Sequence, residues 1–265
     1  MLLAALSPRR RALVLALAGL VVVALLAGLA AAVRPGPARP DQAVPGPVVL
    51  VPGYGGSPAG LQPLAARLRA DARRVVVLDL PDGGRGDLRE QADALDDAVG
   101  RLESEGASSV DVVGYSAGGV TARLWASGHD GEHRARRIVT LGSPHHGTTA
   151  AAEADAAVGG CGGACSQLAP GSRLLATLNE GDETPEGPQW LAVWTAADAT
   201  VTPPESGRLD GAVNVRLQDV CPGQVSHGEL PRDLAVVGLV LTALSAEPIG
   251  PPREGCAAYR ARGRG

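Results

Sequence analysis

The sequence predicts an α/β protein with a mostly parallel central sheet of about six strands and helices on both faces. Short apolar runs alternate along the chain with segments in which apolar residues recur every three or four positions. This alternation is typical of strands joined by crossover helices, because parallel strands need long connections. Apolar residues also make up 45% of the 265 residues, which is enough for a large core.

The N-terminal part of the chain is set apart from the predicted fold. Residues 12–33 carry no charge and follow three arginines at positions 9–11. The run is long enough to cross a bilayer with its cations on the cytoplasmic side, whereas the alanines at 30–32 would suit a cleavage site. We therefore expect residues 1–33 to be a signal peptide or a membrane anchor, with the rest of the chain exported. The Pro-rich residues 34–47 predict an extended linker.

A single globular domain is predicted over residues 48–246, with a Pro- and Gly-rich tail at 247–265. The formal net charge of the whole chain is -4, and removing residues 1–33 would take away three arginines and no acid. An acidic domain argues against nucleic acid as a partner, because phosphate binding depends on clustered cations. We expect a monomer.

The first half of the domain predicts two strands and two helices. VVLV at 48–51 is a continuous apolar run, as in strands buried on both faces. Residues 58–70 carry leucines at helical spacing, and RVVVLDL at 74–80 predicts the second strand. The next helix begins at Asp87, because Glu90 three residues later completes a capping-box pattern.

The middle of the chain continues the alternation of strands and helices up to residue 141, and residues 148–188 do not follow it. SVDVV at 109–113 and RIVTL at 137–141 predict the third and fourth strands. The helix between them is expected to begin just after Ser116. Residues 148–188 are rich in Gly, Ala and Pro, and we expect them to be irregular apart from a short helix near residues 172–178.

Two strands and a helix complete the predicted domain. Residues 190–196 and 213–217 are short apolar runs bounded by turn residues, so they predict the fifth and sixth strands. Residues 230–244 are apolar over a length that suits a closing helix.

The chain contains four cysteines. An even number in an exported protein favours two disulfides, for which three connectivities exist. We prefer Cys161 with Cys165 and Cys221 with Cys256, because the first two are close neighbours in the sequence. A zinc site is the alternative, but no histidine accompanies the cysteines at a zinc-type spacing, and we expect no metal.

The most specific motif is Gly114-Tyr115-Ser116-Ala117-Gly118, which fits G-x-S-x-G. It lies where the third strand is expected to turn into a helix, and a serine in such a bend projects from the sheet as a nucleophile. Small flanking residues permit the turn, and the positive end of the following helix favours a developing oxyanion. An ordinary Gly-rich turn is the alternative.

A serine nucleophile needs a base and an acid that orients the base. In α/β-hydrolases, where this motif is typical, the order along the chain is serine, acid, histidine. Of the five histidines, only His227 follows the last predicted strand. Asp198 directly follows the fifth strand, and strand ends are where such folds carry catalytic groups. Asp210 and Asp219 are the alternative acids.

The oxyanion hole requires two backbone N–H groups aimed at one oxygen. We expect them from Ala117, directly after the nucleophile, and from Tyr54 in the PGYGG loop at 52–56. A dinucleotide fingerprint is excluded for this loop, because Pro58 stands where the pattern needs glycine. Further residues expected to line the substrate site are Gly53, Tyr115, His145 and His146.

Four segments of the sequence resemble the small secreted bacterial lipases of the α/β-hydrolase superfamily. They are VLVPGYGGSP (49–58), VDVVGYSAGG (110–119), VTLGSPHHGT (139–148) and the stretch from WTAADATVTP to VSHGEL (194–230). The resemblance implies the α/β-hydrolase fold and hydrolysis of acyl lipids by Ser116, Asp198 and His227 without a cofactor. Pro52 stands where many lipases have histidine, and the insert before His227 is longer and contains Cys221, so the acyl chain length is left open.

The expected function is therefore serine carboxylic-ester hydrolysis through an acyl-enzyme, with a small-molecule or lipid ester as substrate. The membrane would be a partner only if the N-terminal segment is not cleaved. An acyltransferase or a thioesterase would use the same triad. A non-catalytic binding domain of the same fold would lack a member of the triad, and none is missing from this sequence.

Overall fold

The computed structural model describes residues 7–32, 38–159 and 161–265. Contacts divide the chain into two units, residues 1–38 and 39–265. The first unit contains α1 (Pro8–Ala32). In the part of the chain that the structure describes, no helix combines the length and the apolar character needed to cross a membrane.

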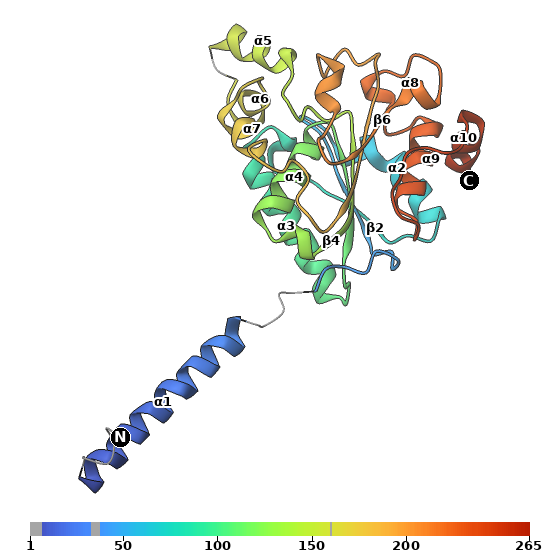
Figure 1. Ribbon diagram of the computed structural model, residues 1–265. Coiled ribbons are helices and arrows are strands. Elements are labelled where there is room, and N and C mark those ends of the chain that lie inside the picture. Colours follow the sequence, from blue (N-terminus) through green and yellow to red (C-terminus); the bar gives the residue numbers. More distant parts are fainter. Residues whose placement is uncertain (1–6, 33–37, 160) are drawn as a thin grey trace. The chain divides into compact units, whose positions relative to one another are not determined.

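The second unit is built on one parallel sheet of six strands, in the order β2-β1-β3-β4-β5-β6 (Figure 1). All five neighbouring pairs are parallel, which confirms the predicted sheet. The strands are β1 (Val48–Val51), β2 (Val75–Val77), β3 (Val110–Tyr115), β4 (Ala135–Leu141), β5 (Gln189–Trp194) and β6 (Val213–Arg216).

The strand order reverses direction at β1. In the register of the sheet, Leu50 of β1 lies opposite Val77 of β2 on one side and Val113 of β3 on the other. The chain thus moves outward from β1 to β2 and then returns to the other side of β1. Ligands of open α/β sheets bind at the carboxyl ends of strands at such a switch point, so the site is expected where β1 and β3 end.

Helices cover both faces of the sheet, because alternate strand residues point to opposite sides (Figure 1). Val48 and Leu50 belong to a core shared with α2 (Gln62–Ala70), α9 (Leu234–Ala243) and α10 (Cys256–Arg264). The core on the other face joins α3 (Leu88–Ser104) and α4 (Ala117–Gly128) to alternate residues such as Val49 and Val51. Short elements complete the unit: α8 (Leu217–Val220) and the 3-10 turns η2 (Pro58–Leu61), η3 (Pro81–Gly84), η4 (Gly131–His133), η5 (Pro204–Gly207) and η6 (His227–Glu229).

The segment over residues 148–188 is more regular than its composition predicts. It contains α5 (Thr149–Val158), α6 (Gly163–Gln167) and α7 (Arg173–Leu178). The helix expected near residues 172–178 is confirmed, but the expectation of an otherwise irregular segment is wrong. Alanine has the highest helix propensity, so the sequence TAAAEADAAV forms α5 without the apolar stripe that marks most surface helices.

The Pro- and Gly-rich tail contains a helix that the sequence patterns do not predict, because α10 packs along α9. The two backbones approach closely, since a Cβ at Gly238 would lie 2.0 Å from the carbonyl oxygen of Tyr259. A Cβ at Gly263 would lie 2.0 Å from the oxygen of Leu234. Tyr259 is buried in the core, and Cys256 is bonded to Cys221.

The C-terminal part of the predicted linker packs on the domain. Pro40 is buried, and the carbonyl oxygen of Gln42 accepts hydrogen bonds from Arg136 and Arg137 at the start of β4. Residues 33–37, which also belong to this predicted linker, lie outside the described residues.

Candidate active site

The site is centred on Ser116, at the sharp turn between β3 and α4. Its backbone has φ 55° and ψ -127°, a region that residues with side chains rarely adopt and that costs about 1–3 kcal/mol. The turn is possible because its neighbours are glycines. A Cβ at Gly118 would lie 2.3 Å from the carbonyl oxygen of Val51, and a Cβ at Gly114 would lie 2.5 Å from that of Gly118. The strain directs the hydroxyl out of the sheet.

His227 lies beside Ser116, although it is 111 residues away in the sequence. Its Nε2 lies 3.0 Å from Ser116 Oγ, and its side chain is almost fully buried. The residue opens η6, where a capping box holds the turn: the carboxylate of Glu229 accepts from the backbone N–H and the hydroxyl of Ser226, at 2.8 and 2.6 Å. Glu229 and Ser226 thus fix the turn from which the imidazole projects.

Asp198 orients His227 from the loop after β5. Its Oδ2 lies 2.7 Å from His227 Nδ1. Its Oδ1 accepts from the backbone N–H groups of Thr200 and Val201, at 2.9 and 2.8 Å. A carboxylate only accepts, so Nδ1 carries the proton and Nε2 offers its lone pair to the Ser116 hydroxyl.

The alternative acids lie elsewhere in the described structure. Asp219 pairs with Arg216, and the backbone N–H of Asp210 donates to the carboxylate of Glu183. Neither carboxylate forms a hydrogen bond with His227 within the described residues. Asp198 is the acid that the fold brings to His227.

Tyr115 supports the histidine from the strand side. Its hydroxyl donates to the carbonyl oxygen of His227 at 3.2 Å, and the two rings lie 5.1 Å apart. Burial, with a smaller contribution from the charge of Asp198, raises the pKa of Tyr115 to about 12. The hydroxyl therefore remains a donor at neutral pH. Among the residues expected to line the substrate site, Tyr115 contacts the histidine itself.

The loop after β1 lies directly against the nucleophile. A Cβ at Gly53 would lie 2.7 Å from the Cβ of Ser116, so only glycine fits at this approach. The N–H of Gly56 donates to the oxygen of Gly53 at 3.0 Å and closes the turn. Tyr54 stands between them with a half-exposed side chain. Ala117 is the first residue of α4, where backbone N–H groups have no partner within the helix.

An apolar cavity of about 180 Å³ opens beside Ser116. Its wall on one side comes from Tyr54, and on another from Thr200 and Val201 after the Asp198 turn. The remaining wall comes from α5 and α6 and the loop that precedes α5.

His145 and His146 do not line this cavity. The ring of His145 is fully buried, with Nε2 3.1 Å from Thr140 Oγ1, and burial lowers its pKa well below the usual value. His146 is exposed and pairs with Glu183 at 2.8 Å. The substrate-lining role expected for both residues has no support in their positions.

Sequence reasoning missed the residues that hold the three side chains in place. Ser226 and Glu229 carried a usable signal, because S-x-x-E is a capping-box pattern. The backbone donors of Thr200 and Val201 carried none, since any residue except proline supplies an N–H. The sequence also gives no sign that Gly142 belongs to the site. A Cβ at this position would lie 3.2 Å from His227 Nδ1 and 3.3 Å from Asp198 Oδ2.

Comparison with known proteins agrees with this architecture. The family described as alpha/beta hydrolase fold matches residues 46–158. No curated protein matches the sequence. The solved structure of the mature Bacillus licheniformis lipase BlEst2 is 18% identical, with 80% of this chain and 95% of that chain covered and a TM-score of 0.64.

Two further solved structures extend the comparison. Aspergillus fumigatus lipase B is 18% identical, with 83% of this chain and 61% of that chain covered and a TM-score of 0.60. The product of the Listeria innocua gene lin2722 is 15% identical, with 78% and 96% covered and a TM-score of 0.57. At these identities the likeness concerns the fold.

Proposed function

We propose that this chain, which has the α/β-hydrolase fold, is a serine carboxylic-ester hydrolase of the lipase or esterase type. The observation that carries the proposal is the continuous hydrogen-bond chain from Ser116 through His227 to Asp198. These residues are far apart in the sequence and meet at the carboxyl edge of the sheet. A strained serine, an oriented imidazole and a buried carboxylate together form the arrangement that acyl transfer requires.

The reaction proceeds in two steps. In the first, His227 Nε2 takes the proton of Ser116 Oγ as this oxygen attacks the ester carbonyl, and the imidazolium then protonates the departing alcohol. In the second, His227 activates a water that releases the acid and restores the serine. Asp198 keeps the imidazole in the required tautomer and stabilises its charged form in both steps.

The oxyanion that forms during each attack needs donors already in place. We assign this role to the backbone N–H groups of Ala117 and Tyr54. Ala117 begins α4, and its N–H therefore belongs to the positive end of the helix dipole. The close contact of Gly53 with Ser116 brings the Tyr54 loop to the same place. Each donor is expected to contribute about 3–4 kcal/mol to transition-state stabilisation.

The site of action proposed for the enzyme is outside the cytoplasm. The pairing of Cys161 with Cys165 and of Cys221 with Cys256 agrees with the preferred connectivity and with an oxidising compartment. Together with the basic and apolar N-terminal sequence, this supports export, with a signal peptide within residues 1–33. The proposed substrate is an acyl ester, either a lipid or a smaller molecule.

The proposal is tested with wild type and Ser116→Ala on p-nitrophenyl esters. We expect kcat/KM to fall by about 10⁴-fold or more in Ser116→Ala, because the nucleophile is lost while the fold is kept. A fluorophosphonate probe should add one phosphonyl group to the wild type and none to the variant, as read by intact mass. Equal hydrolysis rates for the two proteins would remove Ser116 from the mechanism.

The same assay separates ester hydrolysis from its close relatives. A thioester substrate and an added alcohol acceptor are tested with the same protein preparation. Faster turnover of the thioester, or transfer to the alcohol in preference to water, would assign the triad to a thioesterase or an acyltransferase instead.

A further inference from the structure

The cavity beside Ser116 has an outer wall made by two helices that no part of the proposed mechanism uses. On α5, Ala151 is buried and lines the cavity, while Ala150 and Ala154 are exposed at its rim. On the α6 side, Cys165 and Leu168 complete the wall. Small side chains on α5 thus face the nucleophile.

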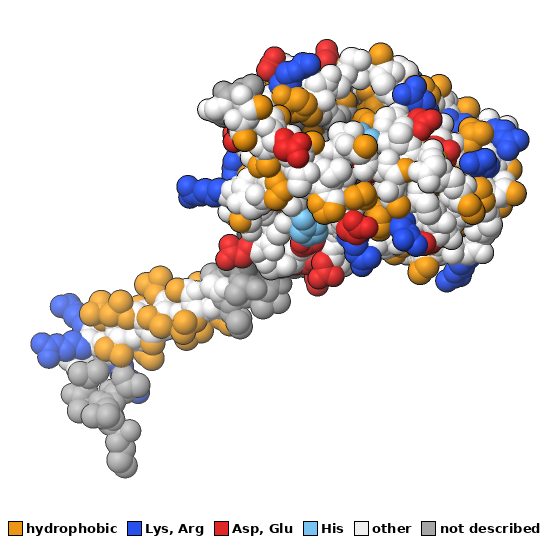
Figure 2. Space-filling view, turned by 90° about the horizontal axis from the view of Figure 1, so that it is seen from above, with side chains coloured by type: hydrophobic (Ala, Val, Ile, Leu, Met, Phe, Trp, Pro, Cys, Tyr) orange, Lys and Arg blue, Asp and Glu red, His pale blue; other side chains and the backbone are white. Residues whose placement is uncertain are grey.

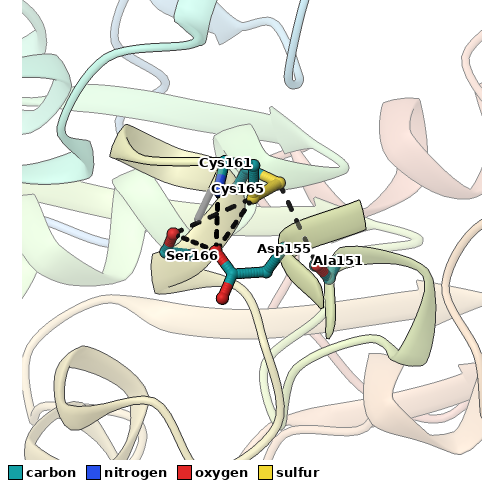
Figure 3. The surroundings of a disulfide bond; sticks show 5 residues. All are labelled: Ala151, Asp155, Cys161, Cys165 and Ser166. Atoms are coloured by element: carbon teal, nitrogen blue, oxygen red, sulfur yellow. Dashed lines mark hydrogen bonds between the residues drawn. A yellow bond between two sulfur atoms is a disulfide. The ribbon is translucent and has the colours of Figure 1, made fainter. Parts of the chain in front are cut away.

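A disulfide and one carboxylate lock this wall (Figure 3). Cys161 is bonded to Cys165 around the start of α6. From α5, Asp155 Oδ1 accepts from the backbone N–H of Cys161 at 2.9 Å and from the hydroxyl of Ser166 at 2.5 Å. The disulfide and Asp155 therefore hold α5 and α6 together.

The wall formed by α5 and α6 is also hydrogen-bonded to the rest of the domain. The N–H of Ala164 donates to the carbonyl oxygens of Arg85 and Gly86, at 3.0 and 2.8 Å. The side-chain oxygen of Gln167 accepts from the N–H of Leu88, which begins α3, at 2.8 Å. Bonds at both ends of α6 hold the wall at a set distance from Ser116.

We infer that the cavity receives the acyl group of the ester and that the α5–α6 wall restricts it to short acyl chains; this rests on the function proposed above. Ser116 lies in the cavity lining, and the acyl group is the part that stays bonded to Ser116 Oγ after the alcohol has left. The cavity volume is about 180 Å³. Pockets for drug-sized ligands begin at about 300 Å³.

The first experiment measures kcat/KM for p-nitrophenyl esters of rising acyl length, and for acetate esters of rising alcohol length. We expect the acyl series to rise about fourfold for each methylene, to peak near four to six carbons and to fall at least tenfold by ten carbons. The alcohol series should show no such limit. A maximum at ten carbons or more, or a limit in the alcohol series instead, would overturn the inference.

The second experiment fills the cavity from its rim. Ala154→Phe should lower kcat/KM for the hexanoyl ester at least tenfold more than for the acetyl ester. Ala156→Phe places the same side chain on an exposed position of α5 that does not line the cavity, so its chain-length profile should match wild type. Identical profiles for the two variants would contradict the assignment of the wall.

The third experiment removes the Cys161–Cys165 disulfide. In Cys161→Ser/Cys165→Ser, the decanoyl-to-butanoyl ratio of kcat/KM should rise at least threefold, because the wall gains freedom to move. An unchanged ratio would contradict the limiting role of the wall. If the wild type hydrolyses no ester of any length, the proposed function fails as well. If it hydrolyses esters with another length profile, only this inference fails.

Discussion

Gly142 shows how tightly the residues around the proposed triad are packed. It follows β4 with φ +55°, a conformation that favours glycine. A Cβ at this position would lie 2.6 Å from Leu230 Cδ1, in addition to its close approach to His227 and Asp198. One methyl group here would therefore meet the histidine, the acid and the core at once.

Gly142→Ala is expected to lower kcat about 10²-fold, because a displacement of the His227–Asp198 pair by as little as about 1 Å has an effect of that size. Steady-state kinetics on a short-chain ester measure it, with circular dichroism as a check on folding. Gly100→Ala, in α3 with open space around its Cβ, is the matched control. It should keep full activity and gain about 0.5–1 kcal/mol of stability. Wild-type kcat in Gly142→Ala would contradict the geometry described for the pair.

At the residue scale, the sequence points to candidate site residues where a motif or an order along the chain restricts the choice. Ser116 was marked by its glycines, and His227 by being the only histidine after the last strand. Asp198 was marked by its place at a strand end. His145 shows the limit, because the sequence places it after β4 but does not say that its ring turns inward to Thr140.

At the scale of elements, the strands and the long helices followed from apolar patterns. These patterns exist because each element buries one face or both. α5 and α6 escaped prediction because an alanine-rich helix and a five-residue helix carry no apolar stripe. α10 was missed for a related reason: alanines and arginines make up most of this helix, and Tyr259 and a disulfide join it to the domain.

The Cys221–Cys256 disulfide joins the end of α8 to the start of α10. Cys221 precedes His227 by six residues. Its partners are 35 residues apart, so the cross-link is expected to stabilise the fold by about 3–4 kcal/mol. Cys221→Ser/Cys256→Ser should lose that amount in urea unfolding. It should also lose kcat/KM at temperatures where it is still folded, because the His227 loop loses an anchor.

The other disulfide provides the comparison for this prediction. Cys161 and Cys165 are only 4 residues apart, so Cys161→Ser/Cys165→Ser is expected to lose less than about 2 kcal/mol. Equal losses of unfolding free energy in the two double variants would contradict the loop-length argument. Full activity of Cys221→Ser/Cys256→Ser, with both substitutions verified by mass, would exclude the anchoring role.

For the molecule as a whole, burial of His145 links stability to pH. Desolvation lowers the pKa of His145 in the folded state, with smaller contributions from Arg123 and His146. Above pH about 6.5 the imidazole is neutral in both states. Below it the unfolded chain takes up a proton that the folded chain refuses, so stability is lost as pH falls.

Urea unfolding of wild type and His145→Gln between pH 8 and 5 tests this linkage. The wild type is expected to lose up to about 1.4 kcal/mol more per pH unit than the variant below pH 6.5. Between pH 7 and 8 the two curves should run parallel. Curves that stay parallel down to pH 5 would show that His145 takes up its proton equally in the folded state.

The spacing of the proposed triad along the chain has a consequence for biosynthesis. The nucleophile is made when fewer than half of the 265 residues exist, whereas the acid and the base belong to the last quarter or so of the chain. A polypeptide that is still being translated therefore carries Ser116 before Asp198 and His227 have been added. Under the proposed function, such a polypeptide cannot hydrolyse an ester until β5 and η6 have joined the sheet.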